Sequence, residues 1–384
     1  MITGALPLAT LIATLSALAF VLERRVPALS KVGASLLTLV FGAVVSNLGL
    51  VPAASPVYDT IAGPVTYLAI AWLLLSVNLS DVKKVGVRMF GAFGLAVFGT
   101  ALGAFVGAVV FASVLGEDGW RLAGVFTGTY SGGSVNFVSV GRVVELPASL
   151  WSGATAADAL TTGIWMAVSL TLPVWAGRYF APVPKELTEL ADDHAPGAPH
   201  QNHPFFAPAS VSALDLAVLV AAGLALLTAA ELTARLVPQV HTVLWLTTYA
   251  LILGQTRWFH HAEGALQLGT MVLLLFFVVI GIWSRVAEIV AVGAVVFYYT
   301  LVVVGIHGLV VYGLGRLVGV DVGTLSVASQ ASVGGPSSAL AVAVAREWPG
   351  LVLPGIIMGL VGYAVGTYAG VGVANLVRGL GIGL

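Results

Sequence analysis

Residues 127–136 read Thr-Gly-Thr-Tyr-Ser-Gly-Gly-Ser-Val-Asn, in the middle of a long apolar segment. Two adjacent glycines weaken a helix, because each costs about 1 kcal/mol relative to alanine. An unwound stretch inside a bilayer leaves peptide groups unpaired unless they face protein or a water-filled cavity. With the hydroxyls of serine and threonine, such peptide groups can bind a small cation or a carboxylate. For an isolated Gly-Gly pair, close helix packing is the favoured explanation.

A second stretch, residues 329–338, reads Ser-Gln-Ala-Ser-Val-Gly-Gly-Pro-Ser-Ser and repeats the glycine pair. Pro336 lacks an amide hydrogen and therefore breaks or kinks the preceding helical turn. A nearly constant shift also lays residues 284–319 over residues 81–116. Matched interrupted segments in two halves of a chain are typical of secondary transporters and mark a binding site near the bilayer midplane. The sequence thus predicts two repeats, each with a broken membrane helix.

The composition is that of a membrane protein. Of 384 residues, 59% are hydrophobic and only 9% are charged, and the mean hydropathy is +1.02. A soluble domain carries about a quarter charged residues. We therefore expect an all-α polytopic protein in a lipid bilayer, with spans of about 17–25 residues. Twelve apolar segments are candidates: 4–22, 32–50, 58–79, 86–115, 119–145, 148–178, 212–236, 242–256, 264–283, 288–317, 320–346 and 349–378.

The polar stretch at 179–209 divides the chain into a first repeat, residues 1–178, and a second repeat, residues 210–384. Lysine and arginine lie between segments one and two and between three and four, which favours an external N-terminus. Six complete crossings on each side of a linker that does not cross would make the repeats parallel. Inverted repeats require that one segment does not span simply, and the short 242–256 and the broken fifth segments, as re-entrant elements, are the candidates. We favour inversion, and both arrangements stay open.

The charge balance and residue types exclude several function classes. A net charge of −1 gives no indication of a nucleic-acid partner. The absence of cysteine rules out disulfides, thiolate metal sites and thiol catalysis. There is no phosphate-binding loop for ATP-driven transport. Ser131 lies in a Gly-Thr-Tyr-Ser-Gly sequence, but a nucleophilic serine needs a base, and His307 is isolated in an apolar segment. We therefore do not expect an enzyme, and interpret His307 as a hydrogen-bonded core residue.

Asp158 lies about ten residues into its apolar segment and has no basic neighbour at helical spacing. An unpaired carboxylate there costs about 2.5–3.5 kcal/mol and normally faces a cavity or a partner. Thr162 falls four residues later, on the same helix face. Carboxylate and hydroxyl oxygens suit a sodium ion or a proton, so Asp158 is our candidate site for a coupling ion, and no other cofactor is expected. The alternative is a protonated, hydrogen-bonded structural aspartate.

The predicted substrate and ion site gathers the polar residues and glycines of both interrupted segments with those of the helices that follow them. Its members are Thr127, Thr129, Ser131, Gly132, Gly133, Ser134, Asn136, Asp158, Thr162, Gln330, Ser332, Gly334, Gly335, Ser337, Ser338 and Thr367.

These paired Gly-Gly segments, with Ala-Ala-Asp at 156–158 between them, resemble the membrane proteins of domain-of-unknown-function family 819 over almost the whole chain. The resemblance implies the superfamily of cation:proton antiporters and anion transporters. It thereby implies inverted repeats, a panel domain, and a core domain in which two broken helices cross and Asp158 binds the ion. Antiporters often have two adjacent polar or acidic residues there, whereas this chain has Ala157 before Asp158, which leaves the stoichiometry open. No substrate is implied.

The sequence therefore predicts a sodium- or proton-coupled secondary transporter that moves a small organic solute by alternating access. Helix-end amides at the two interruptions would attract an anionic solute, although the sequence indicates no arginine or lysine in the core to pair with it. A homodimer in the plasma membrane of a prokaryote is expected. An intramembrane enzyme using Ser131 or Asp158, a passive channel and an assembly scaffold are the alternatives.

Overall fold

The computed structural model describes residues 2–26, 29, 34–77, 79, 85–188, 211–256, 259, 264–283 and 286–383. In these ranges all regular structure is helical, apart from an isolated β-bridge between Ala181 and Asp321. The predicted all-α class is confirmed for this part of the chain. Of the predicted linker, the structure describes the start, and residues 189–210 lie outside the described ranges.

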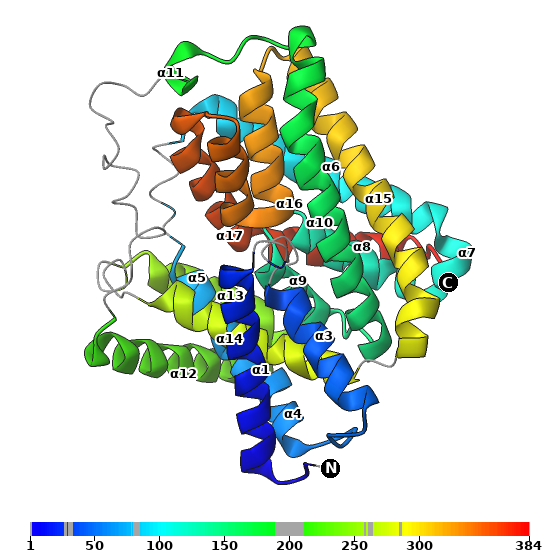
Figure 1. Ribbon diagram of the computed structural model, residues 1–384, viewed down its shortest axis with the longest axis vertical. Coiled ribbons are helices and arrows are strands. Elements are labelled where there is room, and N and C mark those ends of the chain that lie inside the picture. The colour runs from blue at the N-terminus through cyan, green and yellow to red at the C-terminus, as the bar shows by residue number, and fades with distance from the viewer. Residues whose placement is uncertain are drawn as a thin grey trace.

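One group of helices comes from the beginning of each half of the chain. This first helix group comprises α1 (Ala5–Arg25), α3 (Ala34–Asn47), α4 (Pro56–Thr60), η1 (Ile61–Val65), α5 (Thr66–Leu75), α12 (Ala213–Leu236), α13 (Thr242–Gly254) and α14 (Ala265–Trp283). Helix α14 packs on α1, α3 and α5, while α12 and α13 pack on α5 and on each other. Figure 1 shows these helices together in the lower part of the molecule.

The remaining long helices form a second helix group. It comprises α6 (Val87–Val110), α7 (Ala112–Leu115), η3 (Gly116–Asp118), α8 (Gly119–Thr129), α9 (Ser134–Val143), α10 (Ala148–Ala176), α15 (Val286–Leu317), α16 (Val322–Ala345) and α17 (Pro349–Gly379). Helix α6 packs on α15, α17 packs on both α8 and α16, and α10 packs on α15 and α16. The short elements η4 (Gly177–Tyr179) and α11 (Lys185–Thr188) follow α10.

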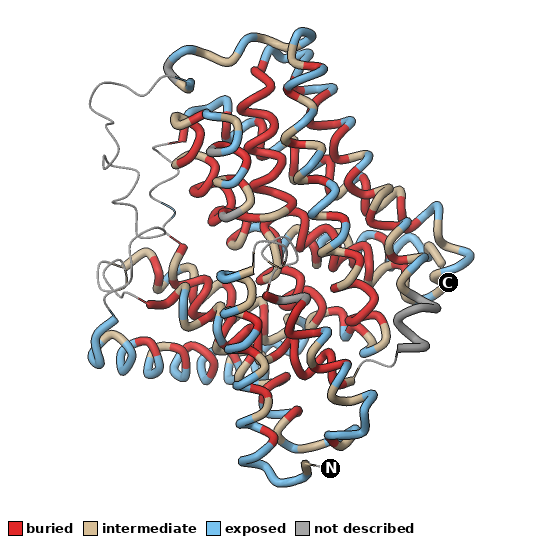
Figure 2. Tube along the Cα trace, viewed as in Figure 1, coloured by how far each residue is buried: buried red, intermediate tan, exposed pale blue. Residues whose placement is uncertain are grey.

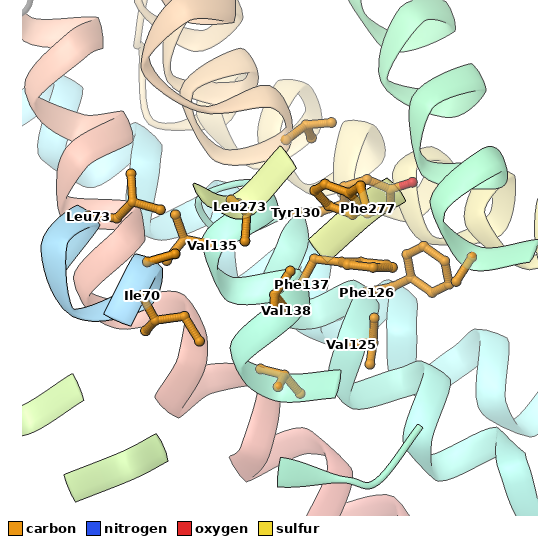
Figure 3. Close-up of a cluster of buried hydrophobic side chains, with 14 of the residues drawn as sticks. Ile70, Leu73, Val125, Phe126, Tyr130, Val135, Phe137, Val138, Leu273 and Phe277 are labelled. Atoms are coloured by element: carbon orange, nitrogen blue, oxygen red, sulfur yellow. The ribbon is translucent and has the colours of Figure 1, made fainter. Parts of the chain in front are cut away.

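Contacts between the two groups are fewer and involve a small set of helices. Helices α9 and α17 of the second group touch α5 and α13 of the first, and α10 touches α3 and α14. Figure 3 shows this boundary, where Val135, Phe137 and Val138 of α9 lie near Ile70 of α5 and Leu273 of α14. All of these side chains are buried. The boundary between the groups is thus apolar along the first turns of α9.

Eight helices of the described chain are long and apolar enough to cross a membrane: 5–25, 56–75, 87–110, 148–179, 213–236, 265–283, 293–317 and 349–379. The other four of the twelve predicted segments are also helical, but differently built. Helices α3 and α13 have only 14 and 13 residues; α8 and α9 are separated by a turn; and α16 contains a non-helical residue. The chain is a multi-pass membrane protein.

The outer surface is apolar, as lipid contact requires. Large hydrophobic side chains such as Leu6 and Leu309 are 79% and 76% exposed. Figure 2 shows exposed residues along α12 and the outer helices, while buried residues run through the middle of the second helix group. Extended exposed apolar surface marks an interaction with a membrane or another protein. With eight candidate spans, a bilayer accounts for it.

Candidate functional site

The backbone leaves the helical conformation at the first glycine pair. Helix α8 ends at Thr129 and α9 begins at Ser134. Between them, Gly133 has φ = 96° and ψ = −166°. Glycine populates positive φ readily because it has no Cβ, which explains why this residue type stands at the turn. The first amides of α9 follow directly, without a side-chain cap.

The second glycine pair has the same backbone conformation. Gly335 has φ = 77° and ψ = −167° within α16, and Pro336 follows it. Gly133 and Gly335 are 202 positions apart. The same separation relates Glu145 and Glu347, the two non-glycine residues of the described chain with positive φ. Two pairs of corresponding positions in the two halves therefore share a positive φ.

The two interruptions lie against each other. A methyl group placed on Gly133 would lie 3.9 Å from the Cα of Gly335, and one on Gly335 would lie 3.5 Å from the carbonyl oxygen of Gly132. Either methyl group would lie 3.8 Å from Cε1 of Tyr363. The helical segments that begin after Gly133 and Gly335 therefore start close together, beside the ring of Tyr363.

Four polar groups around these interruptions are buried without a hydrogen-bond partner. They are the hydroxyls of Thr127, Thr129 and Ser131 and the Nε2 of Gln330. All four residues are at most 1% exposed. Leaving a buried donor or acceptor unpaired costs about 1–3 kcal/mol, and such groups are rare enough in native proteins that each calls for an explanation. Each of them is a candidate ligand for an ion or a polar solute.

Other predicted residues are used within the protein. The amide nitrogen of Asn136 donates to the carbonyl of Gly362, at 2.8 Å, and its oxygen accepts from the hydroxyl of Thr367, also at 2.8 Å. Ser332 donates to the carbonyl of Tyr130 at 2.6 Å. These three hydrogen bonds connect the interrupted segments to their surroundings. They therefore fix the shape of the candidate site rather than offering free ligands.

The remaining members of the predicted set are less informative. Ser134 is half-buried at the start of α9. Ser338 donates to the carbonyl of Gly334 one turn earlier in its own helix, at 3.0 Å. The side chain of Ser337 lies outside the described residues.

Asp158 lies near Tyr130, a residue of the first interruption that the predicted site did not include. The hydroxyl of Tyr130 lies close to Asp158, Thr161 and Thr300, without a hydrogen bond of standard geometry. Thr162 donates to Oδ1 of Asp158 at a long 3.5 Å. No ion pair to Asp158 occurs among the described residues, and the residue as a whole is partly exposed. One acid thus lies beside the tyrosine that precedes Ser131.

Comparison with known proteins agrees with this architecture. The family model described as "Protein of unknown function (DUF819)" matches residues 10–380. This chain belongs to the DUF819 family. The DUF819 chain is also 28% identical over 380 residues to the "Uncharacterized membrane protein YjcL" of Bacillus subtilis (strain 168), and the match covers 95% of this chain and 94% of the relative.

Beside the candidate site, the DUF819 protein has a hydrogen-bonded histidine that connects four helices. Nδ1 of His307 lies 2.9 Å from the hydroxyl of Thr100 and 3.0 Å from the carbonyl of Ala96. Its Nε2 lies 2.8 Å from the hydroxyl of Ser329, which also accepts from the indole of Trp165. Because the Ala96 carbonyl can only accept, Nδ1 donates to it. His307 is a hydrogen-bonded core residue, as the sequence predicts.

Two groups of the DUF819 protein were missed by sequence reasoning. Tyr130 is part of the quoted motif, but its proximity to Asp158 of α10 depends on the fold and cannot be read from their spacing in the sequence. The hydroxyl of Thr100 donates to the carbonyl of Tyr130 at 3.0 Å and so links α6 to the same place. Thr100 stands among glycines and alanines of an apolar span, where only the three-dimensional arrangement reveals its partner.

Proposed function

We propose that this protein is a secondary active transporter, coupled to sodium or protons, that moves a small organic solute by alternating access. The observation that carries the proposal is the contact between the interruptions at Gly133 and Gly335, surrounded by buried hydroxyls without partners. Non-helical backbone at membrane depth is tolerated where it is buried in protein or lines a water-filled cavity. A binding site is a sufficient reason to maintain two such interruptions at one point.

We interpret the two interruptions as the discontinuous membrane helices of two inverted repeats. The common separation of 202 positions between Gly133 and Gly335, and between Glu145 and Glu347, supports the repeats. Inverted repeats require one segment in each half that does not cross the membrane completely. We assign this role to the short helices α3 and α13. The repeats would correspond to residues 1–178 and 210–384, joined by the linker.

In this proposal the solute binds beside the two interruptions. One helical segment starts after Gly133 and another after Gly335, so the positive ends of two helix dipoles lie at one place, and the start of α9 has no side-chain cap. Both features favour an anionic group on the solute. The hydroxyls of Thr127, Thr129 and Ser131 would supply further hydrogen bonds.

The coupling ion would bind at Asp158. Its carboxylate has no basic partner among the described residues, and hydroxyls of Thr162 and Tyr130 lie nearby. Hard oxygen ligands of this kind suit sodium, and a lone membrane carboxylate also suits a proton. Because Tyr130 directly precedes Ser131, ion binding at Asp158 would affect the first interruption through one side chain.

Alternating access would come from movement of the second helix group against the first. The two helix groups have many internal contacts and few contacts with each other. We identify the first group with a panel domain and the second with a core domain, as the family resemblance implies. The same resemblance leads us to propose a homodimer in the plasma membrane.

The test is solute uptake into proteoliposomes with and without a sodium gradient, and with and without a proton gradient. The solutes would be monocarboxylates, dicarboxylates, amino acids and neutral sugars. We expect gradient-dependent uptake of at least one of them, which Asp158→Asn abolishes. Asp59→Asn is the matched control, because Asp59 is exposed. Gradient-driven uptake that persists in Asp158→Asn would rule out the coupling role, and uptake insensitive to any gradient would indicate a channel.

A further inference from the structure

Arg142 lies at the end of α9, where the second helix group meets the first. Its guanidinium lies over the ring of Phe276 on α14, with Cζ 5.3 Å from the ring centroid. Tyr67 of α5 and His241 at the start of α13 lie within electrostatic range of it. Three helices of the other group thus surround a cationic side chain that begins on α9.

Two nitrogens of this guanidinium, Nε and Nη2, are buried and have no hydrogen-bond partner. Their N–H groups point in the same direction and form one edge of the planar guanidinium. This is an edge with which arginine binds a carboxylate or phosphate through two parallel hydrogen bonds. A buried charge is costly when it is left unpaired. The geometry therefore calls for an oxyanion.

The surrounding side chains do not supply that oxyanion. Glu145 follows Arg142 by three residues, but it is exposed and interacts with His241. Glu231 lies within range of Tyr67 and makes no ion pair with Arg142 among the described residues. The phenol of Tyr67 is neutral at pH 7.

A second donor lies on α13. The indole nitrogen of Trp245 is buried without a partner. Trp245 is four residues after His241 and so lies on the same face of the helix. His241 lies within electrostatic range of Arg142. Helix α13 of the first helix group thus carries an unpaired buried donor one turn from His241.

We propose that the Nε–Nη2 edge of Arg142 binds the carboxylate of a small organic anion at the boundary between the two helix groups. Helix α9 extends from the first interruption at Ser134 to Arg142, about 12 Å at the rise of an α-helix. The Arg142 site is therefore separate from the site at the interruptions. As part of the proposed transport function, it selects carboxylates on their way to or from that site, and it supplies the cationic group that the sequence left unassigned.

The experiment measures binding to the full-length protein purified in detergent, by calorimetry at constant ionic strength. The probes are sodium acetate, sodium succinate and inorganic phosphate, with neutral succinamide as the uncharged analogue. We expect saturable binding of acetate or succinate, no binding of succinamide, and at least a tenfold higher Kd in Arg142→Gln. Arg142→Lys, which keeps the charge but loses the fork, should lie between them. The matched control is Arg378→Gln, which removes an exposed guanidinium from the ring of Trp120.

Several results would overturn this assignment. One is the absence of carboxylate binding to the wild type, and another is equal binding to Arg142→Gln and the wild type. A phospholipid phosphate is the other source of an oxyanion. Native mass spectrometry would compare the anionic lipid retained by the wild type and by Arg142→Gln. Loss of lipid from the variant, without any carboxylate binding to the wild type, also contradicts the proposal. If carboxylate binding depends on Arg142 but no uptake occurs, the result supports the Arg142 site and contradicts transport. If uptake occurs and Arg142→Gln does not affect it, the result supports transport and contradicts the Arg142 site.

Discussion

The Cα of Gly132 packs directly on the backbone of Gly362, so that neither residue has room for a side chain. The amide of Asn136 donates to the carbonyl of the same Gly362. Pro336 packs in the same way on Gly359, one turn earlier in α17. Helix α17 therefore supports both interruptions through glycines on one face, and its close approach is what brings the interruptions together.

Replacing Gly362 by alanine should destabilise the protein. The new methyl group would lie 2.5 Å from the carbonyl oxygen of Ser131 and 2.6 Å from the Cα of Gly132, and backbone atoms cannot move aside easily. Overpacking costs about 1–3 kcal/mol, or more, so we expect a lower melting temperature in detergent. Gly372→Ala in the same helix is the control, because no atom lies within 4 Å of the new methyl group. Equal melting temperatures of the two variants would contradict the packing described here.

Asn136 and Thr367 should behave as a coupled pair. Thr367→Val leaves the amide oxygen of Asn136 buried and unpaired, which costs about 1–3 kcal/mol. Asn136→Leu removes that oxygen together with the hydrogen bond to Gly362. The double variant should therefore lose less stability than the two single variants together, by about 1 kcal/mol. Chemical denaturation of all four proteins measures this coupling, and strict additivity would show that the hydrogen bond does not form.

Ser131→Ala and Ser332→Ala should have opposite effects. The hydroxyl of Ser332 donates to the carbonyl of Tyr130, so its removal should cost about 1 kcal/mol. The hydroxyl of Ser131 has no partner, and its removal should leave stability unchanged or higher. If Ser131 binds the solute or ion, the same variant should raise the KM for uptake. A loss of stability in Ser131→Ala as large as in Ser332→Ala would mean that its hydroxyl is bonded within the protein.

The sequence was sufficient for the features that depend on local chemistry. Composition determines the membrane class, and the Gly-Gly pairs predict where the backbone leaves the helical conformation, because glycine tolerates positive φ at Gly133 and Gly335. Glu145 and Glu347 also have positive φ, which their residue type does not suggest. Their common separation becomes visible only when backbone angles are compared.

Features that depend on packing between distant segments could not be predicted. Arg142 ends an apolar segment, where an arginine usually reaches the membrane surface. Its burial depends on Phe276, more than a hundred residues away in the sequence. The predicted segment 242–256 agrees with α13 (Thr242–Gly254) to within two residues, but its hydropathy does not show which helices it contacts. Predicting how the helices are arranged in the bilayer therefore requires knowledge of the contacts between distant segments.

His307→Leu should be among the most destabilising single substitutions in the second helix group. The leucine fills similar space but leaves the Ala96 carbonyl without the donor that Nδ1 provides, and removes the acceptor or donor facing Ser329. Two disrupted buried hydrogen bonds correspond to about 2–4 kcal/mol. His241→Leu is the control: His241 accepts from the amide of Val243 at the start of α13, so only one cap is lost, at about 1 kcal/mol. Melting temperatures of the two variants in the same detergent compare the costs. If His307→Leu were no worse than His241→Leu, the histidine would not be a structural connection among α6, α15 and α16.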